Sequence, residues 1–353
     1  MSSLSRRTVP AVVLAWSVAA SCLGSGSFAA AGPPTAAADG GSPKLAAAVL
    51  LPARSAPSSA PLPGTACPVF PADNVWHADV QRLAVHPRSR QWLAATGAGK
   101  RRLHPDFGPS YGEQSEPYGI PVTVVGAGHG AVGVDFDYAD ESDRRPYPLG
   151  DDTRIEGGRD ARGDRHAIVV DATTCTLYET WDTHPGSPRW SAGSGAVWDL
   201  RSNALRPKGW TSADAAGLPI LPGLLRWDEV AAGKVDHAIR FTASTTSRTF
   251  VWPARHQAGA TSDKAYPPMG ARFRLKKSFS LRGYSAQTKV VLRAMKRYGL
   301  ILADNGSSWY FQGTADPAWP DHLIEQLKRV PAKAFEAVNT RPLKASADSG
   351  RVR

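Results

Sequence analysis

The sequence is poor in cysteine and lacks several common catalytic signatures. It holds three cysteines among 353 residues, too few for a zinc site made of cysteines. It has no His-Glu-x-x-His segment and no phosphate loop with Gly-Lys-Ser/Thr, which argues against a zinc protease and a nucleotide hydrolase. Beyond the N-terminal region, no apolar run approaches the roughly 20 residues that span a bilayer. We therefore expect no cofactor and no transmembrane segment in the mature chain.

The N-terminal residues have the pattern of an export signal. Arg6 and Arg7 precede the apolar run Val9–Leu23, and Ala29–Ala31 supply the small residues that a signal peptidase requires. We expect residues 1–31 to be a signal peptide and the protein to be secreted, by the general or the twin-arginine route.

Two cysteines would remain after removal of this signal. Cys22 lies within it, and a weak lipobox leaves a lipid anchor at Cys22 as an alternative. Cys67 and Cys175 would then meet an oxidising environment, so we predict that they form a disulfide. Such a bridge closes a loop of on the order of a hundred residues and, by loop entropy, stabilises the fold by about 4 kcal/mol.

Composition divides the chain beyond the signal into three parts. Residues 32–65 are rich in Ala, Pro, Gly and Ser and lack apolar periodicity, so we expect a flexible tether. Residues 66–340 are enough to bury a full core, and we expect them to form one catalytic or binding domain. Residues 341–353 are polar and without pattern, which predicts a disordered tail.

The charge is strongly positive. The formal net charge is +11, and loss of Arg6 and Arg7 would leave +9. A basic exported protein is attracted to anionic polymers or surfaces, although basic composition also simply keeps a protein soluble. The basic residues form no long cluster except around Lys289–Arg297, where a helix end favours cations, so we expect no nucleic-acid partner. We expect a monomer.

Short segments of period two, divided by Gly, Pro and Asp, predict a mainly β fold. Two of them flank Asn305-Gly306, a sequence typical of type I′ turns, and should form a hairpin. Together with few helices, they favour a β-sandwich or barrel-like single domain with a few short helices. The predicted strands are Pro121–Val125, Ala131–Tyr138, Ala167–Asp171, Thr176–Trp181, Ala238–Thr242, Arg248–Trp252, Ala271–Leu275, Leu300–Asp304 and Ser307–Gln312.

Two helices have recognisable boundaries. Ser285 can cap a helix whose apolar face includes Val291 and Met295 and which Gly299 ends. A second helix is predicted to begin after Pro320.

Several carboxylates lie beside aromatic residues, as in enzymes that hydrolyse sugars with an acid and a base or nucleophile. Glu179 shares a predicted strand face with Trp181, Asp199 follows Trp198, and Asp236 precedes His237. We expect an exported glycoside hydrolase that acts on a polysaccharide or cell-wall glycan with a pair drawn from Glu179, Asp199 and Asp236, with His237 as a further candidate. Ion pairing or turn capping are the alternative roles for these residues. The residues predicted to bind substrate are Trp181, Trp198, Arg240, Trp252, Arg255, His256 and Tyr310.

Two weaker patterns also bear on the site. Asp135, Asp137 and Asp140 crowd oxygen ligands as calcium sites do, but without the spacing of an EF-hand, and a solvated acidic loop is the preferred interpretation. His166 and His237 each open a predicted strand with His-Ala-Ile after an aspartate, so two strands could bring matching imidazoles to one sheet face.

Two other functions remain open. A polysaccharide lyase would use His237 or Tyr310 as the base on an anionic polymer, and Tyr310-Phe311-Gln312-Gly313 loosely resembles the Tyr-Phe-Lys block of jelly-roll alginate lyases, with Gln312 in place of the lysine. A non-catalytic cell-wall or polysaccharide-binding protein is the third possibility.

Two longer blocks resemble segments of a group of exported bacterial proteins of actinobacterial type. They are Leu292 to Gly313, LRAMKRYGLILADNGSSWYFQG, and Trp198 to Leu225, WDLRSNALRPKGWTSADAAGLPILPGLL. The resemblance covers most of Cys67 to Val338, which implies one integrated module. It implies no catalytic residue.

Overall fold

Strands dominate the structure, a computed structural model that describes residues 61–110 and 117–353. Within these residues twelve strands form three sheets, none of them a closed barrel, and the helices are few and short. The described residues belong to one structural unit. The predicted mainly β class with a few short helices is therefore confirmed.

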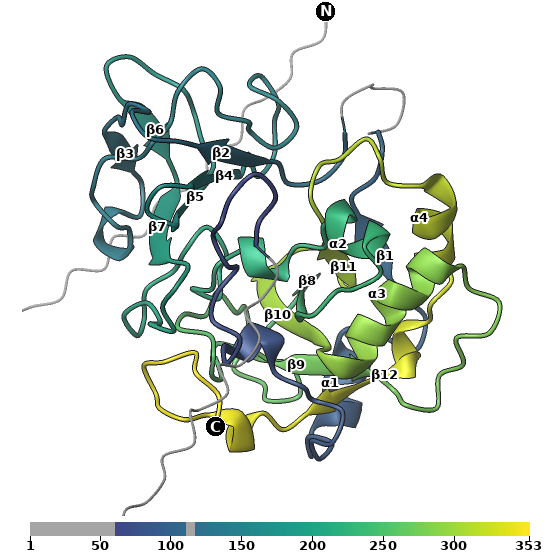
Figure 1. Ribbon diagram of the computed structural model, residues 1–353. Helices are drawn as coiled ribbons and strands as arrows, with labels where there is room; N and C mark the ends of the chain where they lie inside the picture. The colour runs from purple at the N-terminus through teal and green to yellow at the C-terminus, as the bar shows by residue number, and fades with distance from the viewer. Residues whose placement is uncertain (1–60, 111–116) are drawn as a thin grey trace, which may run out of the picture. The chain divides into compact units, whose positions relative to one another are not determined.

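The largest sheet has six strands in the order β1-β11-β8-β10-β9-β12. It is mixed, because β10 pairs parallel with β8 and antiparallel with β9. Helices α1, α3 and α4 pack against its strands (Figure 1). The strands are β1 (His104–Asp106), β8 (Ile239–Ala243), β9 (Arg272–Leu275), β10 (Leu300–Asn305), β11 (Tyr310–Gln312) and β12 (Phe335–Val338).

The predicted hairpin between the last two of the expected strands is wrong. In the sheet, β8 lies between β10 and β11. After β10 the chain crosses the end of β8, where Gly306 N donates to Ala243 O at 3.2 Å and Trp309 N donates to Thr242 O at 3.1 Å. Gly306 has φ of +154°, outside the type I′ region, so Asn305-Gly306 serves a crossover rather than a tight reversal.

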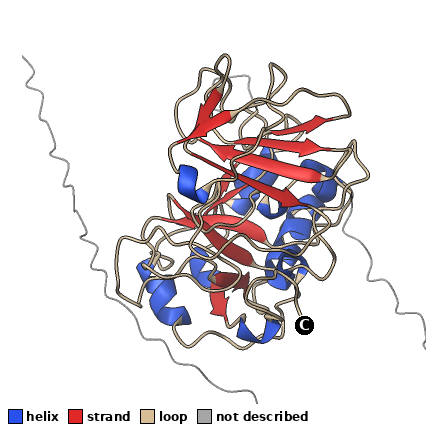
Figure 2. Ribbon diagram, turned by 90° about the vertical axis from the view of Figure 1, so that its left-hand side faces the viewer, coloured by secondary structure: helices blue, strands red, loops and turns tan. Residues whose placement is uncertain are grey.

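A second sheet of four strands and a third of two lie together on another side of the domain (Figures 1 and 2). In the four-stranded sheet both faces of β4 are buried: Ile168 and Val170 pack with Leu177 in one core, and Ala167 and Val169 pack in another. The four-stranded sheet contains β2 (Val122–Val125), β4 (Ala167–Asp171), β5 (Thr176–Trp181) and β7 (Ser194–Asp199), and the two-stranded sheet contains β3 (Val134–Phe136) and β6 (Trp190–Ala192).

The helices follow the local signals in the sequence. Ser285 Oγ accepts a hydrogen bond from Thr288 N at 3.2 Å and caps α3, and Gly299 follows its end with φ of +75°. Both predicted helices are thus confirmed, since α4 begins after Pro320. The helices are α1 (Ser89–Ala95), α2 (Trp227–Ala231), α3 (Ala286–Arg297) and α4 (Asp321–Leu327), with the 3₁₀ helices η1 (Val75–His77), η2 (Ala139–Glu141), η3 (Leu221–Gly223), η4 (Ala332–Ala334) and η5 (Arg341–Leu343).

The predicted disulfide is confirmed. Cys67 and Cys175 are bridged with their Cα atoms 5.3 Å apart, and both are fully buried. The bridge ties the start of the described domain to the turn between β4 and β5. The predicted signal peptide and residues 32–60 of the predicted tether lie outside the described residues. In the part of the chain that the structure describes, no helix is long and apolar enough to cross a membrane.

The C-terminal residues, for which the sequence predicts disorder, are paired with the domain in this structure. Arg351 forms a bridge with Asn74, and Lys344 forms one with Val352. Trp252 Nε1 donates to Ser349 O at 2.9 Å. The Arg351 bridge and the Trp252 bond join backbone groups of the segment to distant parts of the chain, so they cannot be inferred from the polar composition of residues 341–353.

Candidate functional site

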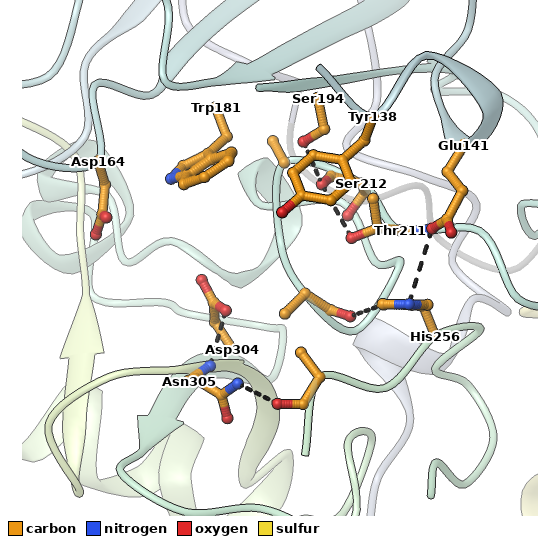
Figure 3. Close-up of a pocket in the computed structure, with 13 residues that line it drawn as sticks. Tyr138, Glu141, Asp164, Trp181, Ser194, Thr211, Ser212, His256, Asp304 and Asn305 are labelled. Carbon is orange, nitrogen blue, oxygen red and sulfur yellow. Dashed lines mark hydrogen bonds and ion pairs between the residues drawn. The ribbon is translucent and has the colours of Figure 1, made fainter. Parts of the chain in front are cut away.

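A cavity of about 320 Å³ lies where the end of β10 meets the edge of the four-stranded sheet (Figure 3). We call it the Asp304 pocket. Asp304 and Asn305 lie on one side of it, facing Trp181, Tyr138 and Ser194, with Asp164 toward one end and Glu141 and His256 toward the other. Its walls are Tyr138, Glu141, Asp164, Trp181, Ser194, Thr211, Ser212, Ala213, Ala215, His256, Ala258, Asp304 and Asn305.

A register shift in β10 places the two polar side chains at the pocket wall. Pairing with β8 is irregular between Leu302 and Asp304. An irregularity of this kind, like a bulge, changes the direction of the side chains at the end of the strand. Asp304 Oδ1 accepts from Asn305 N at 2.7 Å. The Asn305 side chain is fixed by donating to Ala258 O at 2.6 Å and accepting from Thr246 Oγ1 at 2.9 Å.

Buried charges lie directly beneath Asp304. Arg240 Nε donates to Asp214 Oδ2 at 2.8 Å, Arg240 Nη2 donates to the other Asp214 oxygen, and Asp214 is 0% exposed. Burial opposes the charge of Arg240, but Asp214 outweighs it, so the pKa of Arg240 lies above its ordinary value. Arg240 Nη2 is also 3.7 Å from Asp304 Oδ2.

The carboxyl group of Asp304 has a raised pKa. Burial raises its pKa to about 7, the negative charge of Asp214 adds to the rise, and Arg240 opposes it. Its side chain is still 23% exposed, so it remains in contact with solvent through the pocket. A carboxyl group that holds a proton near neutral pH is suited to general acid catalysis.

At the other end of the pocket an imidazole and a carboxylate face each other. His256 Nδ1 donates to Ala215 O at 2.8 Å, which leaves Nε2 without its proton in the neutral ring, 3.8 Å from Glu141 Oε2. Glu141 Oε2 accepts from Thr211 N at 2.9 Å. Both groups are therefore held in place by backbone contacts.

The opposite wall offers aromatic and hydroxyl groups. The rings of Tyr138 and Trp181 have centroids 6.4 Å apart, and Tyr138 is 55% exposed. Ser194 Oγ donates to Ser212 O at 2.8 Å. Such a wall presents apolar faces to a flat ring beside groups that hydrogen-bond its hydroxyls.

A buried histidine lies close to these charges. His166 Nδ1 and Glu156 Oε2 are 2.6 Å apart, while His166 Nε2 is buried without a hydrogen-bond partner. Burial opposes its charge, but Glu156 outweighs burial and raises the pKa of His166 to about 9. His237, which precedes β8 of the six-stranded sheet, instead contacts Glu229, and His166 precedes β4 of the other sheet, so the two His-Ala-Ile segments do not share a sheet face.

Glu179 lies behind the pocket wall rather than in it. Its carboxylate is 0% exposed and accepts hydrogen bonds from Ile220 N at 2.8 Å and from Leu221 N at 2.8 Å. Burial raises the pKa of Glu179 to about 8, against the effect of these two bonds. It joins β5 to the start of η3. Its catalytic role stays a prediction, and in this conformation its oxygens have no contact with solvent.

The other predicted catalytic residues lie elsewhere, and none lines the Asp304 pocket. Asp199, the last residue of β7, accepts from a backbone N–H two residues on, at 2.8 Å. Asp236 Oδ2 is 2.8 Å from Lys234 Nζ, and His237 Nε2 is 3.0 Å from a buried glutamate oxygen. These three residues and Glu179 are thus engaged in separate local contacts.

Two predicted binding residues, Trp181 and His256, line the pocket, and Arg240 lies beneath it. The other four are placed differently. Trp198 is buried in the core of the four-stranded sheet, and Arg255 forms an ion pair with the C-terminal segment. Tyr310 stacks on a histidine ring at 3.9 Å, and Trp252 lines a separate cavity.

The acidic loop proposed for calcium holds ion pairs instead. Asp135 pairs with Arg189 at 2.7 Å, and Asp140 pairs with Arg144. Among the described residues, no group of three His, Cys, Asp or Glu side chains is arranged to hold a metal ion.

One further sequence signal is the Gly-x-Ser-x-Gly spacing of Gly108, Ser110 and Gly112. In a nucleophile elbow this spacing lies between a strand and a helix. Ser110 follows β1, but residues 111–116 lie outside the described range, and no described bond joins Ser110 to His104, the nearest histidine along the chain. Ser110 lines a different cavity, so the spacing adds no residue to the Asp304 pocket.

Compared with protein-family models, curated proteins and solved structures, the chain gives no match. The functional argument therefore depends on the pocket itself. Asp304 and Asp164 were not among the predicted site residues, because Asp304 has the sequence context of a turn and Asp164 that of a loop. Only their proximity across the pocket distinguishes them.

Proposed function

We propose that this chain is a carbohydrate-active hydrolase that cleaves glycosidic bonds of a polysaccharide in the Asp304 pocket. The observation that carries the proposal is a carboxyl group with a pKa of about 7 that faces other carboxylates and an aromatic wall across one cavity. Asp304 would act as the general acid. Asp164, an exposed carboxylate with no hydrogen bond or ion pair to another described residue, would act as base or nucleophile.

The charge of the pocket favours a neutral sugar. Two carboxylates, Glu141 and Asp164, line it against one imidazole, His256, besides the Asp304 carboxyl, which as general acid would hold a proton. A uronate at the same place would meet like charges, which disfavours binding by Coulomb repulsion. This argues for hydrolysis over elimination from an anionic polymer, although His256 Nε2 offers a base of the kind that a lyase needs.

The test is turnover of a panel of neutral and acidic polysaccharides by the mature domain, with reducing ends and near-ultraviolet absorbance followed together. Hydrolysis gives reducing ends alone, and elimination also gives an unsaturated product that absorbs. Binding without either signal would favour a non-catalytic polysaccharide-binding protein.

Two variants and a matched control assign the roles. Asp304→Asn and Asp164→Asn should each lower kcat by about 10²-fold or more, whereas Asp160→Asn, in the same loop as Asp164 but outside the pocket wall, should leave it unchanged. Full activity of both pocket variants would refute the assignment. The same assay on Glu179→Gln, Asp199→Asn and Asp236→Asn tests the residues predicted from the sequence.

A further inference from the structure

A second cavity, of about 380 Å³, has the opposite charge character. It lies where α1, the start of β9 and the segment after β12 meet, elements that adjoin one another in Figure 1. It shares no lining residue with the Asp304 pocket. We call it the basic cavity, and its walls are His86, Trp92, Val251, Trp252, Ala271, Arg272, Val338, Asn339, Thr340, Arg341 and Lys344.

No carboxylate lines the basic cavity, and two of its cations have no partner. The side chains of Arg341 and Lys344 form no hydrogen bond or ion pair with any other described residue. Neighbouring arginines differ, since Arg255 pairs with Asp348 at 2.7 Å and Arg274 pairs with a glutamate at 2.9 Å. The side chains of Arg341 and Lys344 are therefore available to bind an anion.

The third cation of the wall, Arg272, already makes hydrogen bonds within the protein. The Arg272 guanidinium donates to the carbonyl oxygens of Tyr298 at 2.6 Å, Val75 at 2.8 Å and Ala78 at 3.2 Å. It has no carboxylate partner among the described residues, so its charge is not neutralised by an ion pair. It adds to the positive potential of this region without competing for the ligand.

Flat rings and an amide complete the cavity. The rings of His86 and Trp92 stack with centroids 4.1 Å apart, and Trp252 is held by its bond to the C-terminal segment. Asn339 Oδ1 accepts from Arg341 N at 3.1 Å, which fixes the turn that carries Arg341 and leaves the Asn339 amide nitrogen free to donate. The cavity thus combines ring-packing surfaces with convergent donors.

We propose that the basic cavity binds a saccharide unit that carries an anionic group, either a carboxylate or a phosphate. Arg341 and Lys344 would contact the anion, Arg341 in the bidentate manner that suits both groups. Trp252 would pack against the sugar ring. The proposal is independent of the reaction in the Asp304 pocket, because it uses none of its residues.

The test measures binding of three probes to the mature protein by calorimetry at low salt: a glucuronate oligosaccharide, a hexose phosphate and a neutral oligosaccharide of the same size. We expect at least one anionic probe to bind and the neutral probe to bind at least tenfold more weakly. Arg341→Gln combined with Lys344→Gln should lower the affinity for the anionic probe at least tenfold. This is the loss expected for two charge-assisted contacts.

A matched control distinguishes binding in this cavity from a general effect of the protein's net charge. Lys277→Gln combined with Arg282→Gln removes the same charge from exposed positions outside the cavity and should change the affinity less than twofold. The stronger of the two anionic probes identifies carboxylate or phosphate as the natural group. Equal binding of the neutral probe, no binding of either anion, or equal losses in the two double variants would overturn the proposal.

Discussion

The buried pair Arg240–Asp214 should dominate the stability of the region beneath the pocket. Both side chains are at most 2% exposed and share two hydrogen bonds. Removing one partner leaves an uncompensated buried group, so Asp214→Asn and Arg240→Met should each lower the free energy of unfolding by about 3 to 5 kcal/mol. The double variant should cost less than the sum, because no unpaired charge remains in it.

A double-mutant cycle measures this coupling. Guanidinium unfolding of the four proteins, monitored by tryptophan fluorescence, should give a coupling energy of about 2 to 3 kcal/mol. The exposed pair Arg297–Asp79, at 3.0 Å, is the matched control. Arg297→Met and Asp79→Asn should show coupling below about 1 kcal/mol. Additive losses at Arg240 and Asp214, or equal coupling in both cycles, would refute the reasoning.

Three further perturbations test other contacts. Replacing Cys67 and Cys175 with serine should lower the free energy of unfolding by about 4 kcal/mol in denaturant titrations; a change under 1 kcal/mol would contradict the loop-closure argument. Ser285→Ala removes the cap of α3 and should cost about 1 kcal/mol, whereas Ser285→Asp should cost much less. The raised pKa values of His166, about 9, and Glu179, about 8, mean that the native state binds more protons than the unfolded state, so stability should fall from pH 5 to pH 9. His166→Gln should flatten the part of this decline above pH 6.5, and an unchanged profile would remove His166 as its source.

Local elements were predictable where the signal lies within a few residues. The strands Ala167–Asp171 and Thr176–Trp181 occur as predicted, because a short apolar run in the first, alternation in the second and the turn between them define both elements. The cap at Ser285 likewise fixes the start of α3. The predicted strand Arg248–Trp252 is wrong: the segment has one isolated bridge, between Phe250 and Met269, and this pairing depends on a partner further along the chain.

Long-range pairing and the site were not predictable in the same way. The parallel pairing of β8 with β10 joins segments about sixty residues apart and has no local signature. Asp304 has the sequence of a turn residue, and its raised pKa comes first from burial and then from the charge of Asp214, against the effect of Arg240; the fold alone brings these groups together. Glu179 was predicted as a catalytic carboxylate from its place beside Trp181, and no signal within β5 shows that the backbone N–H groups of Ile220 and Leu221 would bind it.

The bridge between Arg351 and Asn74 places the end of the chain beside an early part of the folded domain. Val352 N also donates to Asp73 O at 2.8 Å. A domain whose first and last segments adjoin in this way can be re-cut as a circular permutant, with a short linker across the junction and new ends in an exposed loop such as that around Gly283.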